Sequence, residues 1–417
     1  MKHIMRHISK LTLLLGVFAL GTGCRGLPAP LPPSERALDV FAGVADVLIL
    51  RGDGSLWAAG NNQSGQLGVG HSAQRGIAGG DVPALSRVYD DEGAPFLGAR
   101  FAAFGENHAV ILREDGTLWG AGDSSFGELG LRGGRLLLFT RLNAGGVPVS
   151  GARAVAAGSN STFFIDGEDS LWAAGFNFYG ELGVGNRDTQ FSFTRVEGLS
   201  GTVRALASGT RHTALLKEDG ALWVAGYNVN GQLGLGDTED RTVFTEARGA
   251  PSGIVAVAAG NHHTVILTDD GSVWAAGSNF WGQLGLPGGG DHPAFTRLTG
   301  ADGGPLTNVR EIAARGDMTL LLMADGSLFL TGNYADPQTM SDIALGVAGS
   351  PIRPTFAPLA PPRRAARSFG EVERVILGNN SIYVIDSNGR LWAAGSNRYG
   401  QLGFDAAMSS VLRIVEH

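Results

Sequence analysis

The sequence predicts an all-β protein, a seven-bladed β-propeller made of four-stranded antiparallel blades. One unit recurs from about residue 40 to the end of the chain, and its copies are 51 to 63 residues apart at a shared aromatic position. The strand that carries this aromatic, LWAAG at 56–60, is apolar on both faces, so its sheet must be packed between two neighbours. Short strands repeated in this way are typical of a propeller. The aromatic occurs seven times, at Trp57, Trp119, Trp172, Trp223, Trp274, Phe329 and Trp392.

The fifth unit illustrates the strands expected in every blade. Segments rich in β-branched and aromatic residues predict strands at 255–260, 263–269, 273–277 and 295–298. Asp270-Gly271 supplies a hairpin turn between the second and third strands, and most other copies have an Asp-Gly or Asn-Gly pair there. No stretch of 12 or more residues after the N-terminal segment has a helical period, which excludes helical solenoids.

The two ends of the repeat region predict how the ring closes. The first unit begins with an apolar run at 40–50 that no fourth strand precedes, and the chain ends in an apolar strand at 411–415. We expect the C-terminal strand to pair with the N-terminal blade, because this pairing removes two exposed sheet edges.

Two segments depart from the repeat. Residues 71–99 are interpreted as a long insertion. Residues 351–369 are interpreted as a divergent mobile loop, with contact to an acidic partner or to lipid phosphates as the alternative. The second segment is basic in an acidic protein, because it holds Arg353, Arg363, Arg364 and Arg367.

The N-terminal segment indicates export. Residues 1–23 combine basic residues with a ten-residue apolar run at 11–20, which is typical of a secretory signal and too short to span a bilayer. The only cysteine, Cys24, follows Gly-Thr-Gly and resembles the acylated cysteine of a bacterial lipoprotein. We therefore predict a signal peptide at 1–23, an acylated cysteine with a Pro-rich tether at 24–38, and the propeller at 39–417. Simple secretion and an uncleaved anchor are the alternatives.

Composition excludes several functional classes. The 65 glycines among 417 residues follow no three-residue period, so the chain is not collagen-like. A single cysteine excludes a disulfide framework and multi-cysteine metal sites. The formal net charge of −7 argues against a nucleic-acid surface, which needs clustered cations.

The run W-x-x-G-x-N-x-x-G-[QE]-L-G, preceded by G-x-x-H and D-G, resembles the repeat of the regulator of chromosome condensation family. Residues 209–236 and 260–286 match it almost throughout, and the resemblance extends over about 40–417. The resemblance implies a seven-bladed propeller. It does not imply one activity, because the family includes a nuclear guanine-nucleotide exchange factor, a plant ultraviolet receptor, ubiquitin-ligase modules and a secreted bacterial inhibitor of β-lactamase.

Two loops of each unit, the G-x-x-H turn and the N-x-x-G loop, are expected to meet on one face. Four of the six N-x-x-G pairs place an aromatic second, where loops are normally polar. Aromatic rings and arginines on rigid loops dominate interface energies, so the rim is a candidate protein-binding site. The alternative is that the rings pack back onto their own blades. The candidate residues are Phe126, Phe178, Tyr179, Phe280, Trp281, Arg398 and Tyr399.

The turn histidines His108, His212, His262 and His263 are interpreted as structural, because three of them repeat a position where the ring can hydrogen-bond and order its own turn; contact with a partner and metal binding are the alternatives. No H-E-x-x-H spacing points to a metal site, and the acidic loop 236–241 lacks the ligand pattern of a calcium loop. No catalytic motif is found, so we predict neither an enzyme nor a cofactor.

These observations predict a monomeric cell-envelope lipoprotein of the outer membrane or cell surface, held to the membrane by a lipid on Cys24. It would bind another protein through the propeller rim, either as a scaffold or as an inhibitor of a secreted enzyme. The alternative is a guanine-nucleotide exchange factor acting on a small GTPase.

Overall fold

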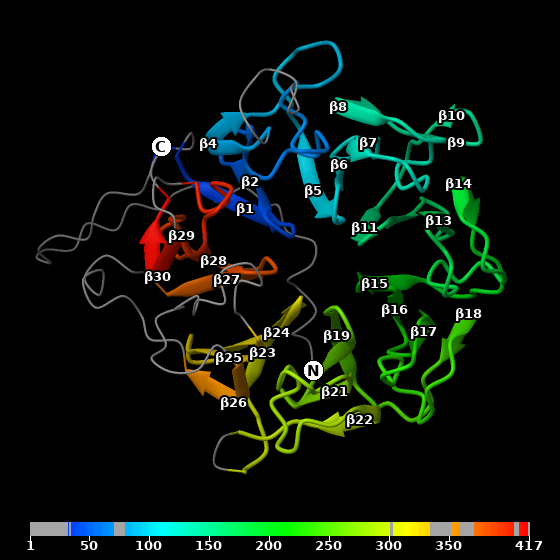
Figure 1. Cartoon of the computed structure of the whole chain (residues 1–417), viewed down its shortest axis with the longest axis vertical. Helices are drawn as coiled ribbons and strands as arrows, with labels where there is room; N and C mark the ends of the chain where they lie inside the picture. The colour runs from blue at the N-terminus through cyan, green and yellow to red at the C-terminus, as the bar shows by residue number, and fades with distance from the viewer. Residues whose placement is uncertain are drawn as a thin grey trace, which may run out of the picture.

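The computed structural model describes residues 32, 35–70, 80–300, 303–333, 352–358, 371–403 and 408–415. These residues form seven four-stranded antiparallel sheets around a central axis (Figure 1), and none of them is helical. The predicted seven-bladed propeller is therefore confirmed. Cys24 and the predicted signal peptide lie outside the described residues. Within the described part of the chain, no helix is long and apolar enough to cross a membrane.

Each blade is built from four strands that are consecutive in the sequence, and a short hairpin, β9 (Asn143–Ala144) with β10 (Val147–Pro148), follows the second blade. Blade 1 comprises β1–β4 (Ala37–Ala42, Asp46–Arg51, Leu56–Gly60, Val82–Arg87), and blade 2 comprises β5–β8 (Ala99–Phe104, His108–Arg113, Leu118–Asp123, Arg135–Arg141). Blade 3 comprises β11–β14 (Ala154–Gly158, Ser161–Ile165, Leu171–Gly175, Gln190–Arg195), and blade 4 comprises β15–β18 (Val203–Ser208, His212–Lys217, Leu222–Gly226, Arg241–Glu246). Blade 5 comprises β19–β22 (Ile254–Ala259, His263–Thr268, Val273–Gly277, His292–Arg297). Blade 6 comprises β23–β26 (Val309–Arg315, Asp317–Met323, Leu328–Asn333, Ile352–Pro358), and blade 7 comprises β27–β30 (Val372–Leu377, Ser381–Asp386, Leu391–Ser396, Met408–Ile414).

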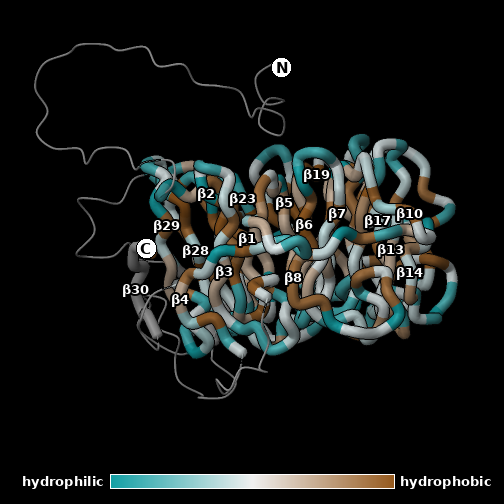
Figure 2. The backbone as a smooth tube through the Cα atoms, turned by 90° about the horizontal axis from the view of Figure 1, so that it is seen from above, coloured by the Kyte–Doolittle hydropathy of each residue, from teal (hydrophilic) through white to brown (hydrophobic). Residues whose placement is uncertain are grey.

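The strands of blade 5 agree with the prediction, except that the fourth begins at His292, three residues earlier than expected. The first strand of every blade lies innermost, and each contacts the first strands of its two neighbours in a closed circle. Seen from the side, strands rich in hydrophobic residues run between two edges of more hydrophilic loops (Figure 2). The loops at these two edges are therefore the surfaces that are free to bind other molecules.

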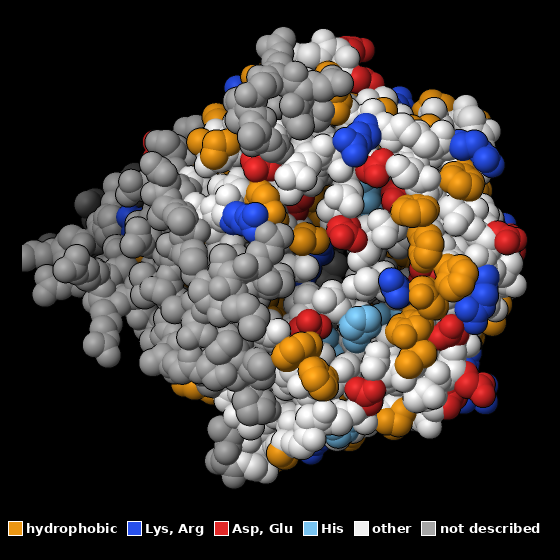
Figure 3. Space-filling view, in the orientation of Figure 1, with side chains coloured by type: hydrophobic (Ala, Val, Ile, Leu, Met, Phe, Trp, Pro, Cys, Tyr) orange, Lys and Arg blue, Asp and Glu red, His pale blue; other side chains and the backbone are white. Residues whose placement is uncertain are grey.

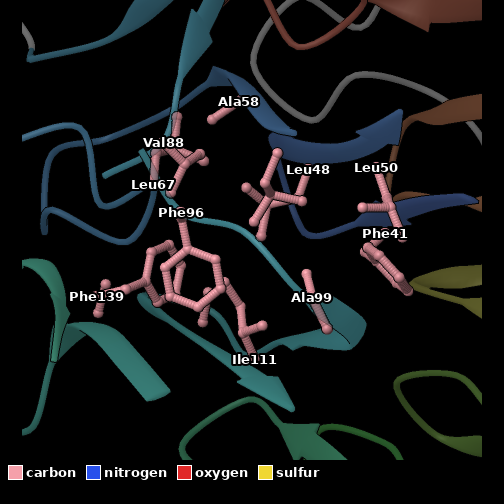
Figure 4. Packing of buried hydrophobic residues seen from close by; sticks show 14 of the residues in the cluster. Phe41, Leu48, Leu50, Ala58, Leu67, Val88, Phe96, Ala99, Ile111 and Phe139 are labelled. Carbon is pink, nitrogen blue, oxygen red and sulfur yellow. The ribbon is translucent and has the colours of Figure 1, made fainter. Parts of the chain in front are cut away.

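The hydrophobic core lies between neighbouring blades. At the interface of blades 1 and 2, Leu48 and Leu67 are buried together with Phe96, Ile111 and Phe139 (Figure 4). Further clusters of this kind lie at the other blade interfaces. This arrangement explains why the third strand of each unit is apolar on both faces, as each face meets a different blade.

The predicted closure of the ring is wrong. The C-terminal strand β30 pairs with β29 of its own blade, and blade 1 is completed by β4, at Val82–Arg87. This strand lies inside the segment that the sequence analysis interprets as an insertion. Its sequence VPALSR lacks the Phe-Thr pair that marks the fourth strand of blades 2 to 5, so it was not recognised as a strand.

The ring closes instead by packing between blades 7 and 1. Val40 and Ile49 of blade 1 are buried against Tyr383 and Ile385 of blade 7. The N–H of Ala37 donates to the carbonyl oxygen of Gly389 (3.0 Å), and Arg374 forms an ion pair with Asp39 (2.5 Å). A hydrophobic cluster thus fills this interface, as at the other six.

The basic segment 351–369 also requires a correction. Residues Ile352–Pro358 form β26, the outer strand of blade 6, where the sequence analysis expects a mobile loop. An outer strand has one unpaired edge, which is where prolines such as Pro354 and Pro358 are tolerated. Arg353 belongs to this strand, whereas Arg363, Arg364 and Arg367 lie outside the described residues.

Candidate interaction face

The turn between the first two strands and the N-x-x-G loop share one edge of the propeller in the blades where the structure describes both, as the sequence predicts. The clearest example is Arg211, in the turn of blade 4, whose Nη1 donates to the hydroxyl of Tyr179 in the loop of blade 3 (3.1 Å). We call this edge the interaction face. Figure 3 looks directly onto it.

The N-x-x-G-[QE]-L-G motif builds a rigid loop, as blade 4 shows. The Oδ1 atom of Asn228 accepts the N–H of Leu233 (2.9 Å), and the Oε1 atom of Gln232 accepts the N–H of Asn230 (3.1 Å). Gly231 has φ of 76° and lies so close to the backbone of Pro293 in blade 5 that a Cβ would not fit. Each loop is therefore tied internally and docked on the next blade, which holds its two variable residues in place.

The repeat tryptophans lie in the third strands and point away from this face. Trp392 is buried, and Trp57, Trp119, Trp172, Trp223 and Trp274 are half-buried. The Nε1–H of Trp57 donates to Ser55 in the Asp-Gly turn (2.9 Å). In blade 4, Lys217 lies over the ring of Trp223, 4.0 Å from its centroid. These contacts stabilise the blades at the edge opposite the interaction face.

A continuous row of aromatic rings crosses the interaction face from blade 2 to blade 4. The ring centroids are 5.3 Å apart for Phe126 and Phe176, 6.3 Å for Phe176 and Phe178, 5.1 Å for Phe178 and Tyr179, and 4.7 Å for Tyr179 and Tyr227. The guanidinium of Arg211 lies 4.9 Å from the centroid of Tyr179. We call these five aromatic residues, together with Arg211, the aromatic band. Figure 3 shows hydrophobic side chains gathered along this side of the face, over blades 3 and 4.

The band is open to solvent. Phe178 is 59% exposed and Phe126 is 43% exposed. Tyr179 is half-buried, because it is held between Phe178, Tyr227 and Arg211. Exposed rings on rigid loops lose little conformational entropy on binding, which makes them effective interface residues.

The other candidate residues form two separate pairs. In blade 5, Phe280 is 68% exposed and its ring lies 4.8 Å from the half-buried Trp281. In blade 7, the guanidinium of Arg398 lies 5.4 Å from the ring centroid of Tyr399. The structure thus brings Phe126, Phe178 and Tyr179 together in the aromatic band, and the two pairs lie outside it.

Sequence reasoning missed three members of the band. Phe176 and Tyr227 occupy the position just before the Asn of N-x-x-G, and Arg211 precedes the turn histidine. The sequence does hold a signal for the two aromatic residues. The position before the Asn of N-x-x-G is polar in blades 1, 2, 5 and 7 and aromatic only in blades 3 and 4. The rings meet across blades, so their contact depends on how the blades pack.

Two buried carboxyl groups lie beneath the band. Glu128 and Glu181 stand where other blades have Gln, and their Oε2 atoms accept the N–H groups of Phe126 and Tyr179 (2.9 Å each). Burial raises the pKa of each carboxyl group to about 7. The loops that carry Phe126 and Tyr179 therefore rest on groups that change charge near neutral pH.

Three of the four turn histidines have a structural role, but their rings hydrogen-bond the neighbouring blade and pack against the glycine of their own turn, where the prediction expected a hydrogen bond within the turn. The three rings bond a threonine hydroxyl of the next blade through Nε2: His108 with Thr162 (2.9 Å), His212 with Thr264 (3.0 Å) and His263 with Thr319 (3.0 Å). His262 instead lies at the surface beside Tyr227, with 6.3 Å between the ring centroids.

The acidic loop 236–241 is held by arginines. Asp237 pairs with Arg241 (2.6 Å) and Asp240 pairs with Arg187 (3.2 Å). Among the residues that the structure describes, no group of three or more His, Cys, Asp or Glu side chains is arranged to hold a metal ion.

Comparisons with known proteins agree with the fold. Two models of the regulator of chromosome condensation (RCC1) repeat match the chain, one at residues 168–216 and 219–267 and the other at 101–128, 203–232 and 254–283. The Arabidopsis thaliana ultraviolet-B receptor UVR8 is 30% identical over 255 residues, which cover 60% of this chain and 55% of the receptor. The Bos taurus secretion-regulating guanine nucleotide exchange factor is 32% identical over 249 residues, 57% of this chain and 50% of that protein. The chain thus spans about half the length of these curated relatives.

Solved structures with low sequence identity share the architecture. Human WBSCR16 superimposes with a TM-score of 0.71 at 19% identity, covering 87% of this chain and 95% of that one. Yeast RCC1 (Prp20), in a structure with Kap60 bound, gives a TM-score of 0.66 at 17% identity, covering 97% of this chain and 91% of that one. Together with the seven blades, these matches show that the chain is a seven-bladed β-propeller that contains regulator of chromosome condensation (RCC1) repeats.

Proposed function

We propose that this protein is a binding module that docks another protein on the aromatic band. The observation that carries the proposal is the row of rings from Phe126 to Tyr227, which is contiguous, exposed at Phe126 and Phe178, half-buried at the other rings, and mounted on loops that are hydrogen-bonded internally. Exposed apolar surface of this kind on a rigid support marks protein interaction sites. The similarity to an exchange factor and to a receptor supports a regulatory or binding role.

The cellular setting belongs to the same proposal. The N-terminal segment and Cys24 support an exported lipoprotein of the cell envelope, in which the propeller serves as a scaffold or as an inhibitor of a secreted enzyme. The second candidate function is an exchange factor for a small GTPase, favoured by the 32% identity to the secretion-regulating exchange factor. Export separates the two, because a propeller outside the cytoplasm does not meet cytoplasmic GTPases.

Metabolic labelling with an alkyne analogue of palmitate tests the setting. We expect the analogue to label the full-length protein in its bacterial host and label to be absent from Cys24→Ser, because Cys24 is the only thiol in the chain. Fractionation should place the wild-type protein with membranes. An unlabelled wild-type protein in the cytoplasmic fraction would favour the exchange factor.

Paired substitutions test the binding role of the band. We expect Phe126→Ser with Phe178→Ser to weaken capture of the partner at least tenfold, because truncated aromatic anchors each cost on the order of 2 kcal/mol. The measurement is quantitative affinity capture with immobilised residues 25–417, read by mass spectrometry. The control is Leu97→Ser with Val147→Ser, which removes exposed apolar surface (44% and 68% exposed) away from the band. Equal capture by both double variants would show that the band is not the docking site.

A further inference from the structure

The centre of the interaction face is hollow (Figure 3), and a cavity of about 240 Å³ lies there. All seven blades contribute to its lining, through the ends of their first strands and the turns that follow. Its walls are polar and apolar in about equal measure, and the apolar part includes the small side chains of Ala157, Ala207, Ala258 and Ala314. Polar side chains of Ser159, Thr210, Asn261 and Asn379 also belong to the lining, in the turns.

One position of the repeat lines this cavity in blades 2 to 6 and lies next to a lining residue in blades 1 and 7, and one blade differs from the other six at this position. The position lies three residues before the turn histidine, or before the residue that replaces this histidine. The two residues pair with each other across the turn between the first and second strands. In blade 6 it is Arg315, which pairs with Met318. In the other six blades it is glycine: Gly43, Gly105, Gly158, Gly209, Gly260 and Gly378.

Packing explains the glycines. A Cβ at Gly105 or Gly260 would overlap the ring of the histidine that faces it, His108 or His263. In blade 6 the facing residue is Met318, and the turn continues through Gly316 with φ of 58°. A side chain can therefore be accommodated at this point of the ring only in a blade that has given up the turn histidine.

The side chain of Arg315 reaches across the channel. Its Nη1 and Nη2 atoms each lie 3.4 Å from the carbonyl oxygen of Phe104, which ends the first strand of blade 2. These are long hydrogen bonds to a neutral acceptor. Among the described residues, no carboxylate oxygen lies within 4.0 Å of the guanidinium, as the ion pairs involve other arginines.

The charges around Arg315 leave it without a full counter-ion. The nearest acidic influence is Asp46, whose own pKa burial raises to about 7, so it is only partly ionised at neutral pH. A guanidinium that is partly removed from water without an anion beside it is destabilised, because its lost hydration is not replaced. Arg315 is half-buried in an open cavity with both polar and apolar lining, so its guanidinium is partly desolvated and still accessible to a ligand that supplies the missing negative charge.

We propose that the central cavity is a binding site for a small oxyanion, a carboxylate or phosphate group, held by the guanidinium of Arg315. The planar fork of arginine donates two parallel hydrogen bonds to such a group. Hydroxyl and amide groups of Thr210, Asn261 and Asn379 line the same cavity and provide further polar contacts. The group is either a free anion or the terminal carboxylate of a partner, and both have the same chemistry at Arg315. The inference rests on the channel and not on the aromatic band.

The test is calorimetric titration of residues 25–417 at constant ionic strength with three probes: inorganic phosphate, an acetylated dipeptide with a free C-terminal carboxylate, and the same dipeptide amidated. We expect at least one of the first two to bind and the amidated peptide not to bind. Arg315→Met should lower the affinity roughly tenfold to a hundredfold, as expected for loss of hydrogen bonds to a charged group. Phosphate binding alone would indicate a free anion, and carboxylate binding would indicate a peptide terminus.

A second pair of variants tests the charge at the mouth. Glu106 is an exposed carboxylate among the lining residues, so Glu106→Gln should strengthen anion binding. Glu197→Gln, in the exposed connection after β14, makes the same charge change away from the channel and should leave the affinity unchanged.

The thermal stability of Arg315→Met distinguishes two roles of the arginine: binding an anion, and stabilising the fold through its bond to Phe104. Arg315 is half-buried and makes only long hydrogen bonds to the neutral carbonyl oxygen of Phe104 among the described residues, so its replacement by Met should leave the Tm unchanged or raise it. The proposal would be overturned if no anion binds up to roughly 20 mM, well above the ~1 mM affinity of a weak site. It would also be overturned if Arg315→Met binds anions as the wild type does, or if its Tm falls because the bond to Phe104 is what the arginine provides.

Discussion

Acidification from pH 6.5 towards pH 3 is expected to unfold the protein. Burial lowers the pKa of His108 to about 4 and the pKa values of His212 and His263 to about 3. The unfolded chain takes up these protons near pH 6.5, whereas the folded chain does not, so the free energy of unfolding falls as the pH falls through this window. Each histidine contributes a loss on the order of 1 kcal/mol per pH unit, against a total stability of roughly 5–15 kcal/mol.

The hydrogen-bond geometry explains why these rings stay neutral. The hydroxyl of Thr264 donates to the carbonyl oxygen of Gln232 (2.7 Å), so it must accept the Nε2–H of His212. The Nδ1 atom of His212 is buried and has no partner among the described residues. His263 has the same arrangement with Thr319 and Gln283. Protonation of Nδ1 would thus create a buried charge at a blade interface.

Buried carboxyl groups oppose this trend at higher pH. Burial raises the pKa values of Asp46, Glu128 and Glu181 to about 7, so the folded protein binds their protons more tightly than the unfolded chain does. These three groups therefore raise the free energy of unfolding as the pH falls from about 7 to 4.5. Below that range they add nothing more, because they are protonated in both the folded and the unfolded chain. We therefore expect a shallow change in stability down to about pH 4.5 and a steep loss below it.

Urea unfolding followed by circular dichroism between pH 7 and pH 3.5 measures this dependence. The matched variant is His212→Gln, whose amide N–H can still donate to Thr264 but does not titrate. Below pH 5, the free energy of unfolding should fall less steeply with pH in the variant than in the wild type. The difference in slope should correspond to the uptake of about one proton fewer on unfolding. Parallel curves for the two proteins would show that His212 does not govern acid unfolding.

The second large effect is expected from Gly231→Ala, which should lower the free energy of unfolding by about 3 kcal/mol or more. Its φ of 76° is strained for alanine, at a cost of roughly 1–2 kcal/mol. The added Cβ would also overlap the backbone of Pro293 in blade 5. Overpacking of this kind costs a further 1–3 kcal/mol or so, because backbone cannot move aside as a flexible side chain can.

The chain contains its own control for the backbone strain. Gly236 lies five residues further along, with φ of 87°, and a Cβ there would meet nothing within 4 Å. Its N–H donates to Pro293, and alanine would keep that bond. Gly236→Ala should therefore show only the conformational cost. Equal destabilisation of the two variants in chemical unfolding would mean that the docking of the loop on the next blade contributes nothing to stability.

The sequence by itself determined the number of blades, the strands of most of them and the face on which the variable loops lie. These features follow from local patterns that recur in most of the seven units: alternating apolar residues, Asp-Gly turns, and an Asn and a Gln or Glu that bond backbone groups two to five residues away. Such short-range interactions need no knowledge of the neighbouring blade. Where the local pattern failed, in VPALSR at 82–87, the strand was missed and the closure was predicted wrongly as a result.

Only the tertiary structure decided what lies between blades. Phe126 meets Phe176, His108 bonds Thr162, and Arg315 reaches Phe104 from 211 positions away. Each of these contacts joins residues from different repeats, whose proximity depends on how two sheets pack and twist. The periodicity of the sequence specifies each blade, but it does not state which side chain of one blade faces which side chain of the next. The aromatic band and the cationic channel therefore became visible only once the ring was assembled.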